Sequence, residues 1–202
     1  MRGMMEGCAL VGVTVLLSAC STWHFGPLKP VAIEVVEEGT PIDDGPHKQG
    51  PLFSARLLRL DFSSPTDFFD LSRRHQYNMG IDLQWCQPTG GWDGIGGYPY
   101  FYMGETQVQG HINPVRTTRA WIHADDGKSF LYHAYVPVQQ FKESAGRGVD
   151  QEVSKPYDLA REPRDLCLKV RGGNMLGLHG SSDKAVFSKE MIEAALKRSS
   201  SP

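Results

Sequence analysis

Short segments in which apolar and polar residues alternate recur along most of this chain, and they constrain its fold more than any other feature. Alternation with a period of two is typical of β-strands that bury one face. The segments predicted as strands are residues 31–36, 54–62, 79–86, 100–109, two runs within 117–138, 165–170 and 185–187. Strands and helices do not alternate regularly. The sequence therefore predicts a mainly β fold, an antiparallel β-sandwich, and not a doubly wound α/β sheet.

Two short helices are expected to complete this sandwich. Ser64, Pro65 and Asp67 stand in the order of a cap, a first helical residue and a first-turn acid, which predicts a mid-chain helix ending near residue 74. Ser188 is predicted to cap a C-terminal helix. The apolar stripe of that helix comprises Met191, Ile192, Ala195 and Leu196.

An aspartate–glycine pair at residues 126–127 predicts a hairpin between the two runs of 117–138. A two-residue turn there makes His123 oppose Phe130 and Trp121 oppose Tyr132. A three-residue loop would shift the pairing by one residue. The two-residue turn is favoured because it gathers aromatic rings on one face.

Residues 1–19 have the features of a secretory signal. Arg2 and the amino terminus precede an apolar run that begins near Cys8. That run is too short to span a bilayer as a helix, which needs about 20 residues. A short basic start, a short apolar core and small residues before a cleavage site indicate an exported protein.

The end of this signal, Leu17-Ser18-Ala19-Cys20, resembles the lipobox of bacterial lipoproteins. The resemblance implies cleavage before Cys20 and acylation of its thiol and new amino group with fatty acids such as palmitate. Ser21 in the second mature position implies sorting to the outer membrane, facing the periplasm. A plain signal peptide with an incidental cysteine, or a buried helix, is the alternative.

The predicted organisation has three parts. Residues 1–19 are the lipoprotein signal peptide, and residues 20–30 are a lipidated tether. Residues 31–202 form a single β-rich domain, because the mature chain is long enough for one core and too short for two comfortable ones.

Two cysteines, Cys86 and Cys167, remain after Cys8 is cleaved off and Cys20 is acylated. An even pair in an exported chain predicts a disulfide. Two buried free thiols are the alternative. A redox site is not favoured, because the chain has no Cys-x-x-Cys pair.

Charge argues against nucleic acid as a partner. The chain has 21 basic and 23 acidic residues and a net charge of −2, with the signs interspersed. Nucleic-acid binding needs a basic patch or stripe. We expect the membrane to be contacted through acyl chains on Cys20, and a protein, with a glycan as the alternative, to be the other partner.

The sequence has no pattern typical of a catalytic or metal site. The seven histidines show no zinc-site spacing, and no Gly-x-Ser-x-Gly elbow is present. Residues 179–183 contain His, Ser and Asp, but such a string is more typical of a turn. We therefore expect no catalytic residues, no metal, no cofactor and no enzymatic activity.

Residues 90–102 form a glycine-rich stretch with several aromatic rings. Large amphipathic rings give much contact area at low entropy cost, which favours contact with a partner. The alternative is that the rings fold back over an open end of the sandwich. The candidate contact residues are Trp92, Tyr98, Tyr100, Tyr102 and Trp121.

These features together predict a periplasmic lipoprotein whose domain is a non-enzymatic protein-binding module. It would serve as an envelope assembly component or as an immunity-type inhibitor of an incoming effector. A glycan- or peptidoglycan-binding module is the first alternative. An envelope hydrolase with a scattered active site is the second.

Overall fold

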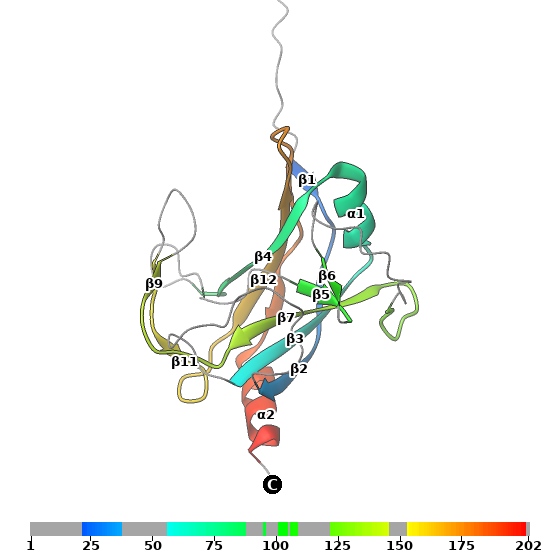
Figure 1. Ribbon diagram of the computed structural model, residues 1–202. Coiled ribbons are helices and arrows are strands. Elements are labelled where there is room, and N and C mark those ends of the chain that lie inside the picture. The colour runs from blue at the N-terminus through cyan, green and yellow to red at the C-terminus, as the bar shows by residue number, and fades with distance from the viewer. Residues whose placement is uncertain are drawn as a thin grey trace, which may run out of the picture.

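Two five-stranded sheets pack face to face in the computed structural model, which describes residues 22–37, 56–87, 95, 101–104, 106–108, 122–145 and 153–200. The first sheet consists of β1 (Thr22–His24), β4 (Asn78–Trp85), β12 (Leu166–Gly173), β13 (His179–Ser181) and β14 (Ala185–Phe187). The second consists of β2 (Lys29–Glu37), β3 (Arg56–Ser64), β5 (Phe101–Met103), β6 (Thr106–Gln107) and β7 (Phe130–Pro137). The helices are α1 (Phe68–His75) and α2 (Lys189–Ser199). The predicted mainly β, antiparallel sandwich with a mid-chain and a C-terminal helix is confirmed (Figure 1).

The core lies between the two sheets and follows from strand alternation. Leu58, Leu60 and Phe62 of β3 are fully buried, whereas the intervening Arg59 and Asp61 are not. The inward residues of the other long strands repeat this period of two. They are Met79, Ile81 and Leu83 in β4, Tyr132, Ala134 and Val136 in β7, and Leu166, Leu168 and Val170 in β12.

The mid-chain helix begins later than the sequence predicted. Asp67, not Ser64, is its cap, and the Asp67 carboxylate accepts a hydrogen bond from the Asp70 N–H at 3.0 Å. Ser64 cannot cap a helix because it is still paired with Phe130 in the β3–β7 ladder. Pro65 therefore lies in the connection before the helix, and not at its first position.

The C-terminal helix matches its prediction. The Ser188 hydroxyl accepts a hydrogen bond from the Met191 N–H at 3.4 Å, and Ile192 and Ala195 are buried. The helix packs along β2, and the Arg198 guanidinium donates to the Ile33 carbonyl at 3.1 Å.

Residues 22–30 are not the free tether predicted for residues 20–30. β1 pairs with the edge of β13, and β2 already begins at Lys29. Between them Phe25 and Leu28 are only 3% and 6% exposed. Two glycines, Gly172 and Gly180, leave the space that the Phe25 ring occupies. The segment therefore belongs to the domain, and only Cys20 and Ser21 of the predicted tether lie outside the described residues.

The described parts of the polar stretch from 139 to 164 pack back onto the domain. β8 (Gln139–Gln140) pairs with β11 (Tyr157–Asp158), and β9 (Ser144–Ala145) pairs with β10 (Val153–Ser154). Gln140 is 1% exposed, and Leu159 is fully buried. The Leu159 N–H donates to the Val138 carbonyl at 2.9 Å, which fixes this part of the stretch to β7.

The hairpin before β7 has the predicted register. His123 bridges Phe130, as the favoured pairing required. The loop is longer than two residues, because the closing hydrogen bond runs from the Ala124 N–H to the Ser129 carbonyl at 2.8 Å. Trp121 lies outside the described residues, so its predicted pairing with Tyr132 stays a prediction.

Candidate functional site

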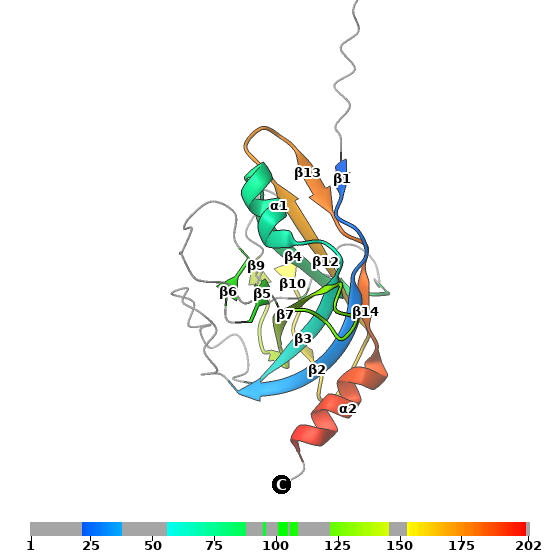
Figure 2. The same ribbon diagram turned by 90° about the vertical axis from the view of Figure 1, so that its right-hand side faces the viewer.

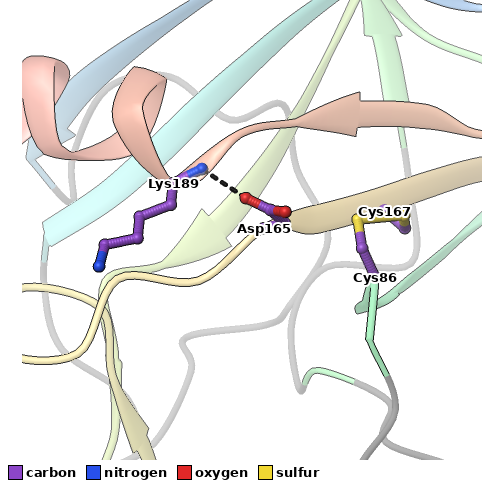
Figure 3. Close-up of a disulfide and its surroundings, with 4 residues drawn as sticks. All are labelled: Cys86, Asp165, Cys167 and Lys189. Carbon is purple, nitrogen blue, oxygen red and sulfur yellow. Dashed lines mark hydrogen bonds between the residues drawn. A yellow bond between two sulfur atoms is a disulfide. The ribbon is translucent and has the colours of Figure 1, made fainter.

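Cys86 and Cys167, which are 81 positions apart in the sequence, form the predicted disulfide, with their Cα atoms 5.0 Å apart. It joins the end of β4 to the start of β12 (Figure 3). The Cys86 N–H donates to the Asp165 carbonyl at 3.1 Å, and the Asp165 carboxylate accepts from the Lys189 N–H at 2.7 Å. Two strands of the first sheet and the start of α2 are thus held together at one point.

The glycine- and aromatic-rich stretch is attached to the core at two described positions, Ile95 and Phe101. Ile95 is 8% exposed, and its N–H donates to the Leu83 carbonyl of β4 at 3.0 Å. Phe101 is fully buried and pairs with Ala134 of β7. Loops attached to a rigid scaffold in this way commonly carry binding residues.

Most predicted contact residues fall outside the described residues. They are Trp92, Tyr98, Tyr100 and Trp121, together with the predicted lipidation site Cys20. Tyr102 is described and is 3% exposed. It packs with Leu57 and Tyr135 in a small core cluster on the outer face of the second sheet. Its ring is therefore buried in packing and is not exposed to a partner.

A polar group borders this small cluster and was missed in the sequence analysis. The His133 imidazole stacks on Tyr102, with ring centroids 5.5 Å apart. On the adjacent strand, Arg59 forms ion pairs with Asp61 at 2.9 Å and with Glu34 at 2.8 Å. The signal was present in the sequence, because these residues occupy the non-core positions of β3, β7 and β2.

Burial and, to a smaller extent, the nearby positive charge of Arg59 together lower the pKa of His133 to about 4. The imidazole is therefore neutral at neutral pH. A neutral ring stacked between core aromatics is not positioned to exchange protons with a substrate, so we assign His133 to packing.

The His/Ser/Asp string at 179–183 is not the turn that its sequence suggested, because His179–Ser181 form β13 and only Ser182 and Asp183 lie in the connection to β14. The Ser182 hydroxyl is 3% exposed, accepts a hydrogen bond from the Val170 N–H at 2.9 Å and donates to the Asp183 carbonyl at 2.7 Å. Both bonds serve the connection between β13 and β14. Within the described ranges no group of three or more His, Cys, Asp or Glu side chains could hold a metal ion.

The most exposed apolar side chains of the described residues lie at the turn between β12 and β13. Met175 is 96% exposed and Leu176 is 85% exposed. They were not among the residues predicted from the sequence; β12 continues to Gly173, just before this turn, through its pairing with β4. The signal that could have found them is an Asn174…Gly177 turn with two apolar residues between.

In the part of the chain that the structure describes, no helix is long and apolar enough to cross a bilayer. Comparison with known proteins adds no relationship: no family model, no curated protein and no solved structure matches this chain. The interpretation therefore rests on the residues themselves.

Proposed function

We propose that this chain is a lipoprotein of the outer membrane, held by acyl chains on Cys20 and facing the periplasm, whose β-rich domain binds another protein. The partner would be an envelope assembly component or an effector that the domain inhibits. The proposal includes no catalytic role.

The disulfide is the observation that carries this proposal. Disulfides persist in oxidising compartments such as the periplasm, so Cys86–Cys167 supports export by the signal that precedes the lipobox. The same bond lies a few residues before the sequence stretch that carries Trp92 and Tyr98. Ile95 and Phe101 of that stretch are held by the core, and attachment to a rigid scaffold would lower the entropy lost if its aromatic rings bind a partner.

Membrane fractionation tests the anchor. We expect the full chain to sediment with membranes after a carbonate wash and Cys20→Ser to be released. A Cys20→Ser protein that stays in the washed membranes would contradict lipid anchoring. Cys86→Ser is the matched control, because it removes a cysteine that is not expected to be acylated.

Photo-crosslinking in intact cells tests partner binding. A photoreactive amino acid at position 92 should give a discrete protein adduct, and one at Lys184, which is exposed on the β13–β14 connection, should not. An adduct whose mobility changes on peptidoglycan digestion would favour the glycan-binding alternative. Adducts only within the chain itself would indicate that Trp92 covers the sandwich.

Affinity and stability separate the two roles of Trp92. If it contacts the partner, Trp92→Ala should weaken binding by about 2 kcal/mol or more, as buried anchors at interfaces do. It should change the free energy of unfolding by no more than about 0.5 kcal/mol and leave the melting temperature nearly unchanged. Trp85→Ala is the matched control, because Trp85 packs against Tyr157 with ring centroids 5.5 Å apart and should lower stability and not affinity.

A further inference from the structure

The turn between β12 and β13 presents two apolar side chains, Met175 and Leu176, which we call the apolar tip. They occupy the two central positions of a β-turn closed by a hydrogen bond from the Gly177 N–H to the Asn174 carbonyl at 3.1 Å. Turn centres normally carry Gly, Asn, Asp, Ser or Pro. With exposed fractions of 96% and 85%, neither side chain contributes packing to the domain.

Other groups already stabilise this turn. The Asn174 side-chain oxygen accepts hydrogen bonds from the Leu176 N–H at 3.0 Å and the Leu178 N–H at 3.1 Å. Gly177 adopts a φ of 79°, a conformation that glycine favours. Asn174 and Gly177 thus account for the backbone, and the apolar side chains need a reason outside the domain.

The N-terminal strand β1 begins at the end of the molecule that carries the apolar tip and runs away from it. Thr22 pairs with His179, which pairs with Gly173, and β1 is parallel to β13. Neighbouring strands are about 5 Å apart. Cys20 precedes Thr22 by two residues, so covalent geometry keeps their Cα atoms within about 7 Å of each other. Thr22, which follows the predicted lipidation site by two residues, is therefore at the same end of the molecule as the apolar tip (Figure 2).

The other exposed groups at this end suit a lipid–water interface. Trp23 is 42% exposed, and its ring lies 4.8 Å from that of His75 at the end of α1. The Asn174 amide donates to the His75 carbonyl at 3.0 Å, so the turn and the end of α1 move together. Arg73 and Arg74 extend from that helix end with 82% and 70% of their side chains exposed, and they pair with Asp70. Tryptophan and arginine side chains both favour the headgroup region of a bilayer.

We propose that the apolar tip inserts into the leaflet that holds Cys20 and forms a second membrane contact. This inference rests on the proposed lipid anchor. A single acyl-chain contact lets a domain rotate, whereas two contacts at one end fix its orientation. The domain would stand upright, with β1 and the β12–β13 turn at the membrane and α2 at the distal end, as the opposite ends in Figure 1 indicate.

A bilayer fits this tip better than a protein partner does. Specific protein interfaces bury about 1,200–2,000 Å² in total, and two side chains at the point of a hairpin offer a small part of that area. A bilayer needs no complementary shape and accepts any exposed apolar group. Because Thr22 at this end follows the proposed acylation site by two residues, lipid is the partner already proposed for this end of the molecule.

A fluorescent label at the tip tests the inference in the full, lipidated protein reconstituted into vesicles of phosphatidylethanolamine and phosphatidylglycerol. Met175→Cys carries an environment-sensitive nitrobenzoxadiazole label. Asp125→Cys is the matched control, because residue 125 has the same place in a turn that Gly127 closes on Ala124. We expect the emission at 175 to shift to shorter wavelength and to be quenched by nitroxide-labelled lipid. The label at 125 should keep the emission of an aqueous dye.

Sedimentation of the same vesicles separates this inference from the proposed function. If the protein sediments but the label at 175 stays in water, the tip inference is wrong and the anchor stands. If the label is shielded without quenching by lipid, a protein covers the tip, and the bilayer is not its partner. If the protein does not sediment, the anchor and the inference both fail. Leu176→Asp in the labelled protein should remove the quenching, because the tip loses its second apolar side chain.

Discussion

The two hairpin turns at residues 124–127 and 174–177 share a design and differ in chemistry. Each is closed by the N–H of a glycine with positive φ, 63° for Gly127 and 79° for Gly177. Each is also braced by a polar side chain, Asp126 in one turn and Asn174 in the other. The central residues of the first turn are both aspartates, whereas those of the second are methionine and leucine.

This difference shows that the backbone conformation does not determine which residue types occupy the central positions of a turn. Asp126 takes part in its own turn by accepting hydrogen bonds from the Lys128 and Ser129 N–H groups at 2.8 and 2.7 Å. Met175 and Leu176 have no comparable task within the fold. The residues of the polar turn are explained by its own hydrogen bonds. For the apolar turn, we propose contact with a bilayer outside the domain.

The contrast continues along the two hairpins. The polar turn leads into β7, which carries the partly buried imidazole of His133. The apolar turn ends β12, whose other end carries the disulfide. We therefore expect the first hairpin to respond to protons and the second to reductant.

Loss of the disulfide should have the largest effect. Cys167→Ser frees a loop of about 80 residues in the unfolded chain, and the chain-entropy argument gives about 4 kcal/mol less stability. Urea unfolding of the oxidised protein and the variant measures this difference. The urea midpoint of the variant should equal that of the reduced wild type. Equal midpoints for the oxidised protein and the variant would contradict a stabilising role of the disulfide.

Acid should have the next largest effect, through His133. The pKa is about 4 in the folded state, while an unfolded histidine has a pKa of about 6.5, so the unfolded chain binds the proton more readily. Stability should fall as the pH drops from about 6.5 to about 4, by about 3 kcal/mol from this group, and this group should add no further loss below that range.

His133→Phe keeps a ring against Tyr102 and cannot take up a proton, so stability should depend less on pH in this window. The measurement is the urea midpoint at several pH values for both proteins. If the two proteins show parallel pH profiles, other groups cause the acid sensitivity and the hairpins do not differ in this respect.

The bracing side chains offer a direct comparison of the two turns. Asn174→Ala removes hydrogen bonds to its own turn and to the His75 carbonyl of α1, and should cost about 2 kcal/mol. Asp126→Ala removes only bonds within its own turn, which are exposed or part-buried, and should cost less. Thermal unfolding of both variants measures the order, and the reverse order would show that the hairpin–helix contact is unimportant.

The smallest effect on stability is expected from exchanging the corner chemistry. Met175→Asp with Leu176→Asp gives the apolar turn the central residues of the polar one, and should change stability by no more than about 0.5 kcal/mol. A melting curve is sufficient to measure this. A large drop would mean that Met175 or Leu176 serves the fold, and the explanation from outside the domain would then be unnecessary.

The sequence predicted what depends on local patterns. Strand alternation identified the buried residues of β3 and β7, Ser188 was correctly recognised as a cap, and an even cysteine count predicted the disulfide. Each of these signals lies within a few residues or within the composition, so no knowledge of the tertiary fold was needed.

The sequence did not predict what depends on a distant partner. Ser64 has the character of a cap, but pairing with Phe130 keeps it in β3. Phe25 looked like part of a linker, because its place against Gly180 exists only after β13 has formed. The apolar tip was not predicted for the same reason, since pairing of Gly173 with Asn78 keeps Gly172 and Gly173 inside β12 and leaves the turn to residues 174–177.

The parallel pairing of β1 with β13 has a mechanical consequence. A pull from a lipid anchor at Cys20 would act on Thr22 along the axis of β1, so the ladder to β13 would be loaded in shear, with its hydrogen bonds resisting together. Phe25 packs against Gly172 and Gly180 directly after the strand, so its ring would have to leave the core before β1 could slide along β13. The short strand would thus transmit tension between envelope and domain without extending, as a rigid connection and not as a flexible linker.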